Sequence, residues 1–114
     1  MKANFTERPA VIEPVGNGIF RYRFNIEEFE TGEGTAFNAD EVFFSELSSN
    51  SILIAVLNYL YGNGIEQKLQ NDYAAVQAGI LTESKAEAYL DFLRNRVLLK
   101  NQIEMDFENY KNSL

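Results

Sequence analysis

A helix-period segment without proline or glycine occupies residues 83–112, with the sequence ESKAEAYLDFLRNRVLLKNQIEMDFENYKN. As an α-helix rising about 1.5 Å per residue it reaches roughly 43 Å, whereas a compact domain of this size has a radius of gyration of about 13 Å. Such a helix either projects from the body of the domain or packs against another copy. The segment therefore predicts assembly, and Thr82 just before it is a suitable N-cap.

The apolar residues of this segment fall into two overlapping stripes. The first is Ala86, Leu90, Leu93 and Val97, and the second, interrupted by Arg96 and Lys100, is Tyr89, Leu93, Ile103, Phe107 and Tyr110. We expect the N-terminal half to serve its own core and the second stripe, above all Ile103, Phe107 and Tyr110, to contact a protein partner in a homo-oligomer. The alternative is that the whole segment folds back on the core of its own chain.

Two shorter helices are predicted before the long one. Ser48-Ser49-Asn50-Ser51 can cap a helix over residues 52–61, whose nearly continuous apolar character is typical of a buried core helix. Gly62-Asn63-Gly64 suits the left-handed conformation that ends a helix. A second helix is predicted over residues 65–78, and Gly79 stops it.

The first third of the chain has strand patterns at residues 10–15, 19–29 and 36–44. Residues 19–29 alternate, with Phe20, Tyr22, Phe24 and Ile26 on one face and Arg21, Arg23, Asn25 and Glu27 on the other, wet face. We expect the arginines to pair with acids of neighbouring strands. Prolines 9 and 14 make the first strand an edge. The predicted fold is α+β, in a single domain over residues 1–114: an N-terminal three-stranded antiparallel meander (1–47) followed by three helices (48–114), the last one long.

No constellation of reactive side chains is visible. The chain has no cysteine and no histidine, which excludes disulfides, thiolate chemistry, the usual zinc and copper sites, and triads that depend on histidine. Each Gly-x-Gly step lacks the third glycine of a dinucleotide fingerprint. The carboxylates of residues 27–41 are best interpreted as a solvated acidic rim rather than a cation site. We expect no enzymatic activity, with no catalytic residue, no cofactor and no metal ligand.

The net charge is −7, with ten Lys and Arg against seventeen Asp and Glu. An acidic surface repels nucleic-acid backbones and anionic lipid, so neither nucleic acid nor a membrane is an expected partner. There is no signal-peptide pattern and no apolar run long enough to span a bilayer. The cytoplasm, or a virion, is the expected location.

Segments such as Tyr22-Arg23-Phe24-Asn25-Ile26-Glu27-Glu28 and Asn71-Asp72-Tyr73 give the chain its one family resemblance. It resembles small uncharacterised proteins encoded in phage and prophage regions of gut Bacteroidales. The resemblance implies a phage structural or tail-assembly accessory protein and assigns no functional residues.

The expected function is thus that of a structural or interaction protein that self-associates, or docks on a larger assembly, through its C-terminal helix. The alternative is a small acidic binding module or inhibitor that acts through the acidic face of its sheet.

Overall fold

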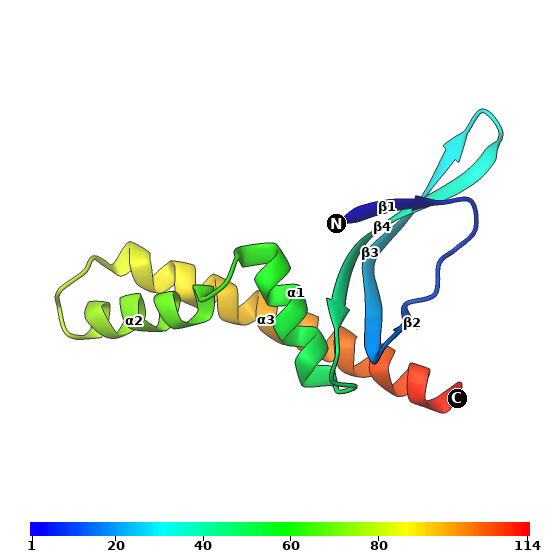
Figure 1. Cartoon of the computed structure of the whole chain (residues 1–114). Helices are drawn as coiled ribbons and strands as arrows, with labels where there is room; N and C mark the ends of the chain where they lie inside the picture. The colour runs from blue at the N-terminus through cyan, green and yellow to red at the C-terminus, as the bar shows by residue number, and fades with distance from the viewer.

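A computed structural model describes all 114 residues and shows an α+β chain (Figure 1). The strands are β1 (Lys2–Phe5), β2 (Ile12–Gly16), β3 (Ile19–Thr31) and β4 (Gly34–Phe44), and the helices are α1 (Ser49–Tyr61), α2 (Ile65–Gln77) and α3 (Glu83–Asn112). The strands form one antiparallel sheet in the order β1-β4-β3-β2. The α+β class is confirmed, and β2 is the predicted edge strand. The sheet has four strands, whereas three were predicted.

The additional strand, β1, lies at the other edge of the sheet. It pairs with β4, with Lys2 opposite Asp40 and Phe5 opposite Phe37. Four residues are too few to show an alternating pattern, and their hydrogen-bond partners lie more than thirty residues away in the sequence. Pairing with β1 covers the stretch of β4 that includes the polar residues Asn38 and Asp40.

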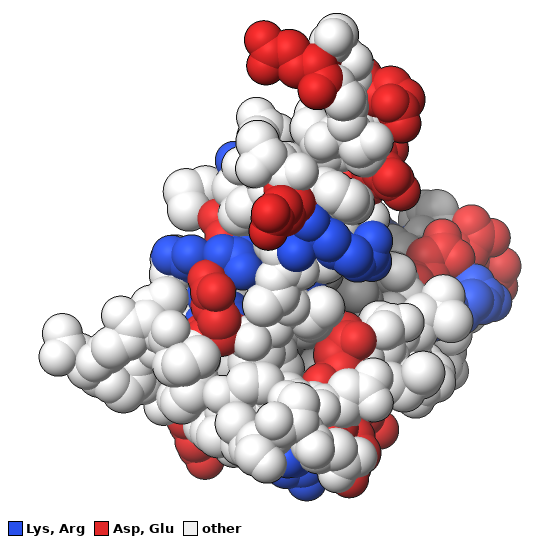
Figure 2. All heavy atoms as spheres, turned by 90° about the vertical axis from the view of Figure 1, so that its right-hand side faces the viewer, with Lys and Arg blue, Asp and Glu red and all other residues white.

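A bulge divides β3 into two parts. Asn25 has a positive φ of 52°, and the register with β4 shifts between Phe24 and Glu27. Before the bulge, Tyr22 and Phe24 are buried. Ile26 lies within the bulge and is only half-buried, because the bulge ends the simple alternation. Beyond it, β3 and β4 continue as a projecting hairpin (Figure 1), whose carboxylates form the acidic cluster at the top of Figure 2.

The sheet face opposite the helices holds a compact ion cluster. The Arg23 guanidinium donates to Glu41 at 2.8 Å, to Glu13 at 2.6 Å and to the Ala10 carbonyl at 3.0 Å. Pairing of the arginines with acids of neighbouring strands is confirmed, but this face is not wet at its centre, because Arg23 and Glu41 are each 5% exposed. Burial alone would lower the pKa of Arg23, whereas hydrogen bonds and charge from Glu13 and Glu41 raise it above its ordinary value.

The helices have nearly the predicted bounds. The Ser48 hydroxyl accepts a hydrogen bond from the Ser51 N–H and caps α1. Helix α2 lies against the N-terminal half of α3, where Glu66 and Arg96 form an ion pair at 2.9 Å. Together these two helices project from the body as a helical hairpin (Figure 1), and the radius of gyration is 17.3 Å, well above the value of about 13 Å for a compact chain.

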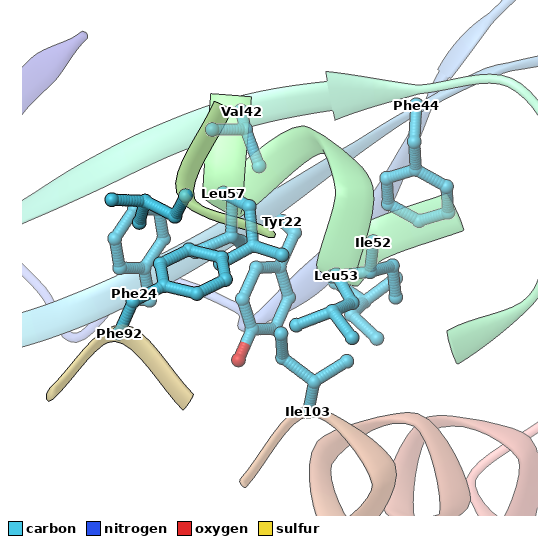
Figure 3. Packing of buried hydrophobic residues seen from close by; sticks show 12 residues of the cluster. Tyr22, Phe24, Val42, Phe44, Ile52, Leu53, Leu57, Phe92 and Ile103 are labelled. Atoms are coloured by element: carbon cyan, nitrogen blue, oxygen red, sulfur yellow. The ribbon is translucent and has the colours of Figure 1, made fainter. Parts of the chain in front are cut away.

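The C-terminal half of α3 completes the core beneath the sheet. Figure 3 shows Ile103 directed at Tyr22 and Leu53, and Ile103 is only 1% exposed. The Tyr22 hydroxyl donates to the Asp106 carboxylate at 2.6 Å. The expectation that the C-terminal half contacts a partner is therefore not met: that half packs on the sheet and α1. The N-terminal half packs on α1 through the buried Phe92 and continues into the projecting hairpin with α2.

Replacement of Ile103 by alanine tests this placement. We expect Ile103→Ala to lower the free energy of unfolding by about 2–5 kcal/mol, because it leaves a cavity under the sheet. Ile54→Ala, the same change at a helical position that is 52% exposed, should cost less than about 1 kcal/mol. Urea denaturation monitored by circular dichroism measures both. Equal losses would contradict the buried position of Ile103.

The hydrogen bond of Tyr22 predicts a dependence of stability on pH. Burial raises the pKa of the Tyr22 phenol, and the hydrogen bond and charge of Asp106 raise it further, so the folded chain keeps this proton when the unfolded chain loses it at about pH 10. The free energy of unfolding should therefore fall as the pH rises above about 10.

Tyr22→Phe should cost roughly 1.5–3 kcal/mol near neutral pH, since a hydrogen bond to a charged group is lost. Its stability should then fall less steeply than that of the native chain between about pH 9.5 and 11. The other five tyrosines are the same in both chains and provide the baseline. Parallel pH profiles in denaturation experiments would show that Tyr22 is not held neutral by the fold.

Candidate interaction surface on the last helix

The five residues predicted to contact a partner all pack within their own chain. Ile103 belongs to the buried core, and the other four are partly buried against it: Tyr89, Leu93, Phe107 and Tyr110. The ring of Tyr89 lies 5.1 Å from that of Tyr73 on α2. The structure therefore follows the alternative, in which the long helix folds back on the core of its own chain. Ile103 has no exposed surface that could contact a partner.

A different set of apolar side chains on α3 faces solvent. These are Leu90 (39% exposed), Val97 (55%), Leu98 (68%) and Met105 (61%). Seven residues separate Leu90 from Val97, and seven separate Leu98 from Met105, so the four lie along one side of the helix. We call these four residues, with the exposed Arg94 and Asn101 between them, the outer stripe.

The outer stripe is exposed because the opposite side of α3 is already occupied. Phe92 and Ile103 are buried on that side, where α3 packs against α1 and the sheet. In the N-terminal half of α3, Asn95 donates a hydrogen bond to the Tyr61 hydroxyl of α1, and the rings of Tyr61 and Phe92 meet edge to face with their centroids 5.1 Å apart. These contacts fix the rotation of α3 about its axis and leave the outer stripe without any partner in the chain.

Sequence reasoning assigned Leu90 and Val97 to the core and overlooked Leu98 and Met105. Leu90 and Val97, and likewise Leu98 and Met105, are seven residues apart, and this spacing was the signal in the sequence that could have identified the outer stripe. Apolar periodicity alone does not say which of two stripes faces inward when a helix carries both. Contacts from α1 and the sheet make that choice, and neither element adjoins α3 in the sequence.

The acidic side chains of the molecule form no comparable site. No group of three acidic side chains is arranged to hold a metal ion. Asp40 accepts hydrogen bonds from Asn25 and Tyr59, and Glu41 is held by Arg23, so two of the clustered carboxylates have structural partners. The hydrogen bond to Asp40 raises the pKa of Tyr59, which keeps that hydroxyl a donor. None of the three helices has the length and hydrophobicity needed to cross a bilayer.

Comparison of the chain with protein-family models, with curated proteins and with solved structures found no match. Its function is therefore inferred from its own geometry.

Proposed function

We propose that this protein is a non-enzymatic structural protein that self-associates through the outer stripe of α3. The observation that carries the proposal is the exposure of four large aliphatic side chains along one side of a helix whose other side is fully used by the fold. Aliphatic residues in such a row are a common signature of a protein–protein interface. The proposed interface lies on the same helix as the one predicted from the sequence and serves the same kind of function, but it uses the outer stripe instead of the predicted stripe.

The surface area of the chain supports an assembled state. Its accessible surface is 7344 Å², whereas a compact monomer of 13.0 kDa exposes about 6,300 Å². The excess of roughly 1,000 Å² is similar to the area of about 800 Å² that each partner buries in a standard interface. Pairing through α3 would therefore bring the exposed surface close to that of a compact chain.

The energetics favour a reversible rather than an obligate contact. Full burial of an aliphatic side chain contributes roughly 1.5–3 kcal/mol, and these four are about half exposed, so covering them contributes on the order of 4 kcal/mol per copy. Association costs at least about 4 kcal/mol in lost translational and rotational freedom. Two copies together contribute about 8 kcal/mol, so the net of roughly 4 kcal/mol corresponds to a dissociation constant of about 1 mM or weaker. Larger assemblies would gain strength from repeated contacts.

The resemblance to phage-encoded proteins suggests the setting, a role in a virion or in tail assembly. The alternative, an inhibitor that acts through an acidic sheet face, has less support. Glu13 and Glu41 on that face are neutralised by arginines. The four glutamates of residues 27–33 lie beyond the bulge, on the projecting hairpin. No contact or cavity at that hairpin points to a ligand.

Leu98→Glu tests self-association directly. It places a charge in the middle of the outer stripe, so the dimer should weaken by at least about 10-fold, which corresponds to 1.4 kcal/mol or more. Sedimentation or light scattering up to about 1 mM protein measures the average mass, because weak dimers appear only at high concentration. The average mass of the native chain should rise above the monomer mass as the concentration approaches about 1 mM.

Ile54→Glu is the matched control, since Ile54 is an aliphatic residue of similar exposure on α1, outside the outer stripe. It should leave the mass of the native assembly unchanged. Circular dichroism should show that both variants stay folded. A native chain that remains monomeric over the whole concentration range would refute the proposal.

A further inference from the structure

The geometry points to a second copy of this chain, antiparallel and related by a two-fold axis, as the partner of the outer stripe. The axis would pass between Val97 and Leu98. This inference rests on the proposed self-association and adds its orientation and register. It makes the interface isologous, with the same patch on both copies.

The outer stripe has the same pattern in both directions. From its centre between Val97 and Leu98, an exposed aliphatic residue comes first, an exposed polar residue follows three positions further out, and another exposed aliphatic residue lies four positions beyond it. Two antiparallel copies centred at this point place Leu90 beside Met105 of the partner and Val97 beside Leu98 of the partner. Every aliphatic side chain of the stripe then meets another aliphatic side chain.

The polar positions distinguish the antiparallel from the parallel orientation. In a parallel pair, Arg94 would lie against Arg94 of the other copy within the seam, and like charges placed together disfavour association. In the antiparallel pair, Arg94 lies beside the neutral Asn101 of the other copy, whose side-chain carbonyl can accept a hydrogen bond from the guanidinium. Asp91 lies 2.8 Å from Arg94 in the same chain and partly balances its charge.

The chain has no cysteine, so single introduced cysteines report on proximity without interference. In the antiparallel pair with helix axes about 8–10 Å apart, residue 97 lies close to its own counterpart, within reach of a disulfide. The two copies of residue 90 are separated by about 22 Å along the axis, since fifteen residues at ~1.5 Å lie between their levels. Mild oxidation of Val97→Cys at about 100 μM should therefore give a covalent dimer.

Leu90→Cys alone should stay monomeric on reducing-agent-free gels, whereas an equimolar mixture of Leu90→Cys and Met105→Cys should cross-link. Glu33→Cys, at the exposed tip of the β3–β4 hairpin, is the control for random collision. A disulfide in Leu90→Cys alone, at a level above that of the control, would show a parallel pair and overturn the orientation.

The two proposals fail in distinguishable ways. A native chain that associates in sedimentation, is disrupted by Leu98→Glu, and yet gives no Val97→Cys disulfide overturns the two-fold arrangement and leaves self-association standing. A native chain that does not associate at all, with no cross-linking above the Glu33→Cys control, overturns both.

Discussion

The contact between Tyr22 on β3 and the C-terminal half of α3 is the constraint on which the rest of the structure depends. The phenol donates to Asp106 at 2.6 Å, while Ile103, one helical turn earlier, fills the space beneath the ring. A hydroxyl and an aliphatic side chain from the same helix thus fix both the position of α3 along the sheet and its rotation. Once that rotation is set, the side of α3 that faces solvent is set as well.

Two extensions follow from this arrangement, because the core is too small to cover the whole chain. The β3–β4 hairpin runs past the bulge at Asn25, and the α2–α3 hairpin runs past α1 (Figure 1). The principal dimensions of 56 × 35 × 22 Å reflect these two projections. The β3–β4 hairpin is acidic, and nothing on it points to a ligand. Helix α3 continues from the α2–α3 hairpin into the core and carries the aliphatic outer stripe.

Charge has a structural role before any role in binding. Arg23 and Glu41 are buried together, and Glu13 and Arg21 extend the cluster toward the edge strand β2. Removing one partner of such a buried pair is strongly destabilising, because the other charge stays buried without a partner or solvent. It fixes the path of residues 6–11 over the sheet through the bond from Arg23 to the Ala10 carbonyl. The net charge of −7 therefore says little about what this face of the sheet binds.

The sequence alone determined the helices to within three residues, since the Ser48 cap and the glycines at 62, 64 and 79 act locally. Thr82 precedes α3 as predicted, but its side chain makes no capping hydrogen bond. The sequence also determined the meander of β2, β3 and β4, whose turns are short. It did not reveal β1, because four residues show no period and their partner is distant. Only the tertiary structure decided which stripe of α3 faces inward: both stripes are apolar and helical in spacing, and Tyr22 and α1 select one of them through contacts between residues far apart in the chain.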